Sequence, residues 1–298
     1  MAAPVLLICV GAAKAGTSWL YRALHDREEC ALPVVKELHY WDTFEAEARD
    51  KQLAAFRARL VQFAESRAAA EAAGRGWQVR NMDRRMADMR DLMATLEADR
   101  VGDAGYRAYL EARAGKAALT ADMTPGYALL DEARLTRVVA LSPMVRILYL
   151  IRDPLARLWS HVRMQAERQR EAHQSFDKKA QGILRRIVKK GHETHLTARG
   201  DYAATIARLR RVVPPAQLMV AFMEEMVTAK GYAAICRFLG LPEAALPAEV
   251  IHEGPKAEMA EDMRAPALEL LRDQYEWVAR NVAPLPPAWA ANYARVSA

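Results

Sequence analysis

The sequence contains little cysteine and no long hydrophobic run. Its 298 residues include Cys9, Cys30 and Cys236, which are widely spaced and match neither a metal knuckle nor a redox pair. We therefore expect free, buried thiols in a reducing compartment rather than a disulfide framework. The first apolar run is short and has no basic region before it, so we expect no signal peptide, no membrane span and a cytoplasmic protein.

The composition is typical of a globular protein with a large core. Hydrophobic residues make up 52% of the chain and charged residues 27%, which excludes a disordered or collagen-like chain. Lys and Arg together number 43 against 37 Asp and Glu, a net charge of +6, so we expect a surface or cleft that attracts anions.

Short apolar runs alternate with stretches of helical periodicity. The runs lie at residues 5–10, 118–121, 146–151 and 217–222, and each is typical of a strand buried on both faces of a parallel sheet. This alternation predicts an α/β fold, a P-loop-like parallel sheet flanked by helices. We expect one domain over residues 1–298, with a helical insertion at about 43–116 and a mostly helical C-terminal third.

The insertion carries a stripe of four methionines at helical spacing: Met82, Met86, Met89 and Met93. Apolar side chains at this spacing usually pack on the body of a protein, which is the simpler interpretation. Because methionine repacks readily, an adaptable wall for a substrate is the alternative.

A glycine-containing loop follows the first predicted strand and precedes a helix. It reads Lys14-Ala15-Gly16-Thr17-Ser18. Backbone N–H groups, a helix N-terminus, hydroxyls and an ammonium group together predict a phosphate site. The usual nucleotide triphosphatase loop is excluded because its lysine directly follows the last glycine. Taken alone, the loop is also compatible with a glycine turn beside a solvated lysine.

A second motif follows the strand predicted at 146–151. Arg152 comes at the strand end, and Asp153 and Pro154 predict a helix that begins at about Pro154. Ser160 lies on that helix, so Arg152 and Ser160 form a candidate second phosphate clamp. Arg157 is more simply explained as a structural ion-pair residue.

Three motifs together resemble the sulfotransferases that use 3′-phosphoadenosine-5′-phosphosulfate (PAPS). The loop from Lys14 to Trp19 resembles the 5′-phosphosulfate loop of that family. The run Lys36-Glu37-Leu-His39-Tyr-Trp41 resembles the Lys-Glu element of its heparan-sulfate and bacterial branches. Arg152-x-Pro-x-x-Arg-x-x-Ser160 resembles its 3′-phosphate motif. Weaker similarities are Thr124-Pro125-x-Tyr127, Gly200-Asp-Tyr202 and the Phe238-Leu-Gly-Leu run.

The resemblance implies residue roles as well as a sulfuryl-transfer activity. Residues that would hold the 5′-phosphosulfate are Lys14, Ala15, Gly16, Thr17 and Ser18. Arg152 and Ser160 would hold the 3′-phosphate, and Trp19 would border the adenine. Lys256 is the candidate for a late loop that covers the nucleotide. Lys14 would also stabilise the leaving oxygen. The family's Glu-Lys-x-Pro element is replaced here by Asp122-Met123-Thr124-Pro125, which weakens any inference about the acceptor.

The transfer needs a base to take the acceptor's proton, and the candidates are Glu37 and His39. If residues 36–41 are extended, both side chains share one face; if they are helical, the two diverge by about 200° and only one can face the sulfur. The resemblance favours Glu37, with His39 as the runner-up, an acceptor contact or a histidine buried under an aromatic lid.

Two other functions compete with this interpretation. A magnesium-dependent kinase that uses ATP would place Asp122 at an acidic strand end, and a non-catalytic relative would bind a nucleotide only. We expect no metal, since His192 and His195 lack zinc-site spacing and a third ligand. The basic residues between 163 and 190 predict a solvated helix face, with acidic polysaccharide binding as the alternative. We expect no nucleic-acid partner. A small-molecule or glycan acceptor, O- or N-sulfation and the oligomeric state stay open.

Overall fold

The structure is a computed structural model that describes residues 3–247, 257–282 and 284–297. Its centre is a four-stranded parallel sheet with the strand order β2-β1-β3-β4. The strands are β1 (Val5–Gly11), β2 (Leu119–Asp122), β3 (Val145–Ile151) and β4 (Leu218–Phe222). All four predicted strands are therefore confirmed, with their boundaries shifted by one residue at most. The α/β fold class predicted from the sequence is correct.

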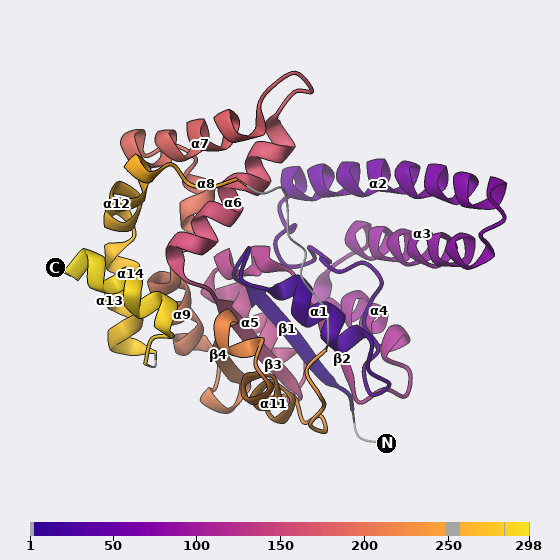
Figure 1. Ribbon diagram of the computed structural model, residues 1–298. Coiled ribbons are helices and arrows are strands. Elements are labelled where there is room, and N and C mark those ends of the chain that lie inside the picture. Colours follow the sequence, from indigo (N-terminus) through magenta and orange to yellow (C-terminus); the bar gives the residue numbers. More distant parts are fainter. Residues whose placement is uncertain (1–2, 248–256, 283, 298) are drawn as a thin grey trace.

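Helices account for most of the remaining chain (Figure 1). The first half contains α1 (Thr17–His25), α2 (Ala46–Ala72), α3 (Gly76–Glu97), α4 (Ala104–Ala114) and α5 (Glu132–Ala140). The middle contains α6 (Pro154–Gln169), α7 (Phe176–Lys190), α8 (Thr194–Ala198) and α9 (Tyr202–Val212). The last part contains α10 (Met223–Met226), α11 (Ala229–Phe238), α12 (Glu261–Leu270), α13 (Arg272–Asn281) and α14 (Pro287–Ser297). Three short 3-10 helices span Val101–Asp103, Pro125–Leu129 and Pro215–Gln217.

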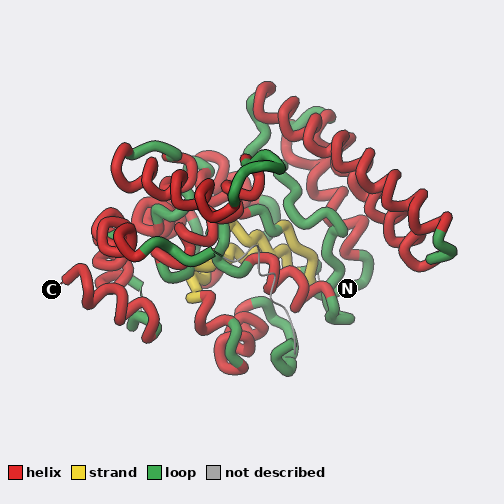
Figure 2. Tube along the Cα trace, turned by 45° about the horizontal axis from the view of Figure 1, so that its top comes forward, coloured by secondary structure: helices red, strands yellow, loops and turns green. Residues whose placement is uncertain are grey.

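The helices enclose the sheet and supply the other half of its core (Figure 2). Strand β1 is buried along its whole length, and β3 is buried except for Arg146. Because both faces of these strands are covered, their sequences are continuously apolar rather than alternating. Because β1 and β3 pair in parallel, their ends lie side by side at the carboxyl edge of the sheet. This edge is where open α/β sheets bind ligands.

The predicted helical insertion consists of α2, α3 and α4. Helices α2 and α3 form an antiparallel hairpin that projects from the body of the protein (Figure 1). Met86 and Met89 are buried, and Met93 packs partly buried against the core. The simpler interpretation of the methionine stripe, packing on the body, is thus confirmed for Met89 and Met93, and Met89 also borders a cavity described below.

The C-terminal helices fix the junction between β3 and α6. The carboxylate of Asp153 accepts hydrogen bonds from Ala156 N at 2.8 Å, Tyr275 Oη at 2.7 Å and Asn292 Nδ2 at 3.1 Å. Each donor satisfies part of a buried charge that would otherwise be costly to desolvate. This network holds the start of α6 in place directly after Arg152.

The three cysteines are buried free thiols, as predicted. None of the described helices is long and apolar enough to cross a membrane. On α7 the apolar residues face inward and basic residues such as Lys178 and Arg185 are exposed, which confirms the predicted solvated face.

Candidate functional site

The glycine loop connects the end of β1 to the start of α1. Gly16 precedes α1 with a φ of 86°, in the left-handed region that favours glycine. A Cβ atom at this position would lie 2.9 Å from Met226 Cε, so a larger residue would also have to displace the end of that side chain. Thr17 is buried and Ser18 is exposed at the first turn of α1. The loop therefore presents the N-terminus of a nine-residue helix, with two hydroxyls, at the sheet edge.

Positive charge gathers around this loop. Burial lowers the pKa of Lys14, and four neighbouring cations lower it further: Arg152, Arg163, Arg168 and Lys36. A lowered lysine pKa of this kind means that the surrounding acidic groups do not compensate the positive charge of the cluster. The ammonium group of Lys14 makes no ion pair within the part of the chain that the structure describes. The site is suited to a ligand with several negative charges.

The two phosphate motifs meet across the sheet edge. Arg152 Nη1 donates a hydrogen bond to Lys14 O at 3.3 Å, although 138 positions separate the residues. Helix α6 begins at Pro154 with Asp153 as its cap, as the sequence predicted. Ser160 is buried on the same helix. The topology thus brings the beginning of α6 next to the glycine loop.

The prediction of an ion pair for Arg157 is wrong. Its guanidinium is buried, and it donates to Leu196 O at 3.1 Å and contacts His161 Nδ1 at 3.3 Å, with no carboxylate partner among the described residues. Gly200 packs on this guanidinium so closely that a Cβ atom would lie 2.4 Å from Nη2. Tyr202 Oη then donates to Arg152 O at 2.6 Å. The segment Gly200-Asp-Tyr202, noted in the sequence as a weak similarity, therefore positions the backbone of Arg152 through the Tyr202 hydroxyl.

The Lys-Glu segment is neither a strand nor a helix, so neither geometry considered for residues 36–41 applies. It is an irregular loop in which His39 has a φ of 55°. The loop nevertheless brings the two candidate bases together, with His39 Nε2 3.6 Å from Glu37 Oε2. Lys36 Nζ lies 3.0 Å from Glu37 Oε1 and 3.4 Å from Thr17 Oγ1. This lysine joins the Lys-Glu loop to the start of α1.

The two candidate bases differ in charge. Burial opposes ionisation of Glu37, but the hydrogen bond with His39 and the charge of Lys36 outweigh it and lower its pKa to about 2. For His39 burial favours the neutral ring, yet Asp42 and Glu37 raise its pKa to about 10. His39 Nδ1 is 3.0 Å from Asp42 Oδ2. At neutral pH Glu37 is therefore a carboxylate and His39 an imidazolium, and Asp42 contacts the other nitrogen of that ring.

A buried hydrogen-bond network below the loop holds these side chains in position. Asp122, at the end of β2, accepts from Thr124 Oγ1 at 2.6 Å and from Tyr127 Oη at 2.7 Å. Thr124 Oγ1 in turn accepts from Leu38 N at 2.9 Å. Tyr127 Oη accepts from Tyr40 N at 2.9 Å. Through these bonds the Asp122-Met-Thr-Pro segment fixes the backbone on both sides of His39.

Sequence reasoning missed the role of four members of this arrangement. Asp42 and Tyr106 were not site candidates, Asp122 was considered only as a metal ligand in the kinase alternative, and Tyr127 was noted only as part of a weak motif. Tyr106 Oη also donates to Asp122 Oδ2, at 2.8 Å. Because burial raises the pKa of Asp122 to about 6 despite these three hydroxyl donors, it is an unusual carboxyl group at a strand end. A carboxylate after a buried strand was the available signal.

Two candidates from the sequence remain, Trp19 and Lys256. Trp19 packs its ring edge against Tyr232 on α11, with centroids 5.6 Å apart. Lys256 lies outside the described residues. Within residues 3–247, 257–282 and 284–297, no group of three or more histidine, cysteine or acidic side chains is arranged to hold a metal.

Comparison with known proteins identifies the class. The model of a sulfotransferase family matches residues 4–245, and the chain belongs to this family. A crystal structure of a sulfotransferase from Alicyclobacillus acidocaldarius is similar, with 21% identity, a TM-score of 0.60 and coverage of 97% of this chain and 100% of the other. The sulfotransferase domain from the curacin biosynthetic pathway is 16% identical with a TM-score of 0.48, covering 99% and 98%. A search of curated proteins gave no match.

Proposed function

We propose that this sulfotransferase moves a sulfuryl group from PAPS to a hydroxyl or amine of a small-molecule or glycan acceptor and releases adenosine 3′,5′-bisphosphate. The observation that carries the proposal is the meeting of Lys14 and Arg152 at the N-terminus of α1, in a cluster of cations. Helix N-termini and cationic side chains bind phosphate groups. The three buried free thiols support a reducing, cytoplasmic location.

The donor would lie across the ends of β1 and β3. Backbone N–H groups of the loop from Lys14 to Ser18 would hold the 5′-phosphosulfate, and Arg152 with Ser160 would hold the 3′-phosphate. Trp19 would border the adenine, and Lys256 is the candidate for a covering loop. The surplus of positive charge around Lys14 fits this polyanion. The donor supplies an activated sulfuryl group.

Glu37 is the better supported base. It is ionised at neutral pH, whereas the ring of His39 is already protonated and has no site left for the acceptor's proton. The carboxylate would take that proton while the acceptor oxygen or nitrogen bonds to sulfur and the bond from sulfur to the phosphate oxygen breaks. His39 would orient Glu37, in turn held by Asp42.

Two cations would stabilise charge during the transfer. Lys14 stands on the loop and would stabilise the phosphate oxygen as it leaves. Lys36 bridges Glu37 and Thr17, so negative charge placed at the start of α1 would attract it away from Glu37. Losing that neighbour would raise the pKa of Glu37 and make it a stronger base.

The kinase alternative finds less support. It relied on Asp122 as a metal ligand, but three hydroxyl groups donate to this buried carboxylate and engage both of its oxygens. The lysine of the glycine loop also stands two residues before Gly16 rather than after it.

The test is turnover of PAPS with a panel of alcohol and amine acceptors, followed as release of adenosine 3′,5′-bisphosphate. Glu37→Gln should lower turnover by about 10²–10⁴-fold because it removes the base. Binding of the bisphosphate, measured by calorimetry, should be almost unchanged. Glu47→Gln, an exposed glutamate in the first turn of α2, is the matched control and should behave like the wild type.

Three outcomes would contradict parts of this proposal. Normal turnover in Glu37→Gln would remove Glu37 as the base. Magnesium-dependent turnover of ATP would favour the kinase. Binding of the bisphosphate without transfer to any acceptor would favour a non-catalytic relative.

A further inference from the structure

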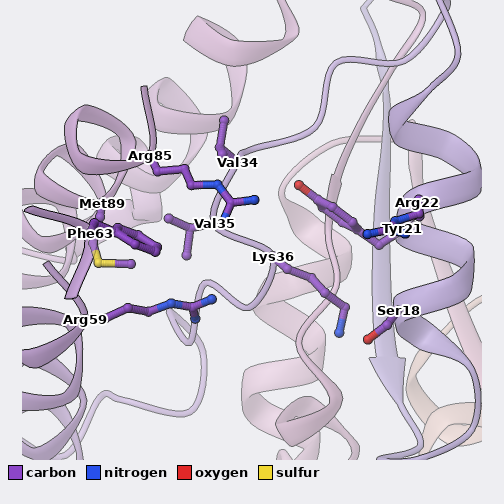
Figure 3. Close-up of a pocket in the computed structure, with 10 residues that line it drawn as sticks. All are labelled: Ser18, Tyr21, Arg22, Val34, Val35, Lys36, Arg59, Phe63, Arg85 and Met89. Atoms are coloured by element: carbon purple, nitrogen blue, oxygen red, sulfur yellow. The ribbon is translucent and has the colours of Figure 1, made fainter. Parts of the chain in front are cut away.

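A cavity of about 250 Å³ opens between α1 and the α2–α3 hairpin (Figure 3). The loop that carries Lys36 runs between these two walls. The residues that line the cavity are Ser18, Tyr21, Arg22, Val34, Val35, Lys36, Arg59, Phe63, Arg85 and Met89. The volume is below the usual range of ligand pockets, about 300–1,000 Å³. It suits one ring-sized group rather than a long chain.

The lining contains four cations and no acidic residue. Among the described residues, Lys36 alone of these four has an acidic partner, Glu37. Arg22, Arg59 and Arg85 form no ion pair with the described residues. The Nε atom of Arg85 is buried and has no hydrogen-bond partner among them. Buried donors are normally satisfied, so the hydrogen bonds of this arginine with the described residues are incomplete.

Aromatic packing keeps the two hairpin arginines close to the cavity. The guanidinium carbons of Arg59 and Arg85 lie 5.5 Å and 5.7 Å from the centroid of the Phe63 ring. Cation–π contacts of this kind hold the guanidinium groups without neutralising them. Phe63 and Met89 also give the hairpin wall an apolar surface. The cavity therefore combines a hydrophobic wall with unpaired positive charge.

Two residues connect the cavity with the proposed reaction centre. Lys36 and Ser18 both line it, and Lys36 Nζ is 3.0 Å from Glu37 Oε1. Figure 3 shows Lys36 between the hairpin and α1. A molecule that fills the cavity can therefore place one end near the proposed base while its other end lies between Arg59 and Arg85.

We propose that this cavity is the acceptor subsite and selects a small acceptor that carries an oxyanion group, such as a carboxylate. This inference rests on the proposed sulfuryl transfer. The ring-sized body of the acceptor packs on Phe63 and Met89, and the oxyanion pairs with Arg59 and Arg85. The hydroxyl or amine that receives the sulfuryl group points toward Glu37. A neutral acceptor of the same shape leaves the arginines unpaired and binds less tightly.

The test compares two probes that differ only in charge, 4-hydroxyphenylacetate and 4-hydroxyphenylacetamide. Their binding is measured by calorimetry on the full chain, with and without saturating adenosine 3′,5′-bisphosphate. The acid should bind at least about tenfold more tightly than the amide, since a hydrogen bond to a charged group contributes that much. In Arg85→Gln, and separately in Arg59→Gln, this preference should largely disappear.

The matched control is Arg90→Gln, which removes an exposed arginine of α3 that does not line the cavity. It should keep the preference for the acid. Equal binding of the two probes, undetectable binding of both, or a preference that survives in both cavity variants would overturn the subsite. Absence of bisphosphate binding would instead overturn the proposed function, and the nucleotide-free titration would still decide whether the cavity selects an oxyanion.

Discussion

The two sides of the proposed site are built by different means. On the donor side, formed by the ends of β1 and β3, the backbone of a glycine loop and a helix N-terminus face the ligand, with Lys14 and Arg152 beside them. On the acceptor side, formed by the loop at 34–42 and the α2–α3 hairpin, side chains dominate, among them Glu37, Arg59 and Arg85.

This difference explains how specificity is divided in the chain. A backbone cradle depends on a few glycine and hydroxyl positions and binds the same phosphate groups whatever the acceptor. A wall made from a helical insertion can change its charge by single substitutions without disturbing the sheet. Under the proposed assignment, the donor side would define the reaction and the acceptor side would define its substrate.

The hydrogen bonds below the Lys-Glu loop offer a way to disturb the acceptor side while leaving the donor side intact. Tyr127→Phe removes the hydroxyl that accepts from Tyr40 N and donates to Asp122. Because a buried group then loses its partner, unfolding should become easier by about 1–3 kcal/mol and kcat should fall by about tenfold. Bisphosphate binding should stay normal. Steady-state kinetics and calorimetry measure the two effects.

Tyr293→Phe is the matched control for that experiment. The Tyr293 hydroxyl on α14 makes no hydrogen bond to the described residues. Its removal should therefore alter neither the free energy of unfolding nor kcat. If Tyr127→Phe weakened bisphosphate binding as strongly as it reduced kcat, the two sides would not be independent.

The charge of His39 gives a smaller, spectroscopic test. Its pKa is raised from 6.5 to about 10, so the stability that comes from its charged form is fully present below pH 6.5 and is lost as the pH rises through about 10. NMR of the imidazole signals, assigned by comparison with His39→Gln, should show a protonated ring between pH 5.5 and 8. A ring that titrates near pH 6.5 would restore His39 as a base.

The sequence was sufficient for the sheet, for the start of α6 and for the proximity of Lys14 and Arg152. Its strands are continuous apolar runs, and the capped start of α6 follows from Asp153 and Pro154, so local patterns determine both. Lys14 and Arg152 could be paired because the ends of adjacent parallel strands meet at one edge. The ion pair expected for Arg157 was wrong because nothing in the sequence shows that Leu196 and Gly200 surround it.

The acceptor side was beyond sequence reasoning because its geometry is tertiary. Residues 36–41 adopt neither regular conformation, since their backbone N–H groups donate hydrogen bonds to the Thr124 and Tyr127 hydroxyl oxygens. Arg59 and Arg85 lie on different helices and meet only because the hairpin folds back on itself. Neither residue belongs to a motif, so only the packed structure shows that they share a cavity.

The central claim, a site for a nucleotide with a 3′-phosphate, is tested most directly by comparing adenosine 3′,5′-bisphosphate with adenosine 5′-monophosphate in calorimetric titrations. We predict that the bisphosphate binds at least about 10-fold more tightly, since the additional phosphate forms charge-assisted hydrogen bonds with Arg152. Arg152→Ala should abolish that difference, and Lys14→Ala should weaken both nucleotides. Equal affinities in the wild type, or binding of ATP with magnesium in preference to the bisphosphate, would contradict the account.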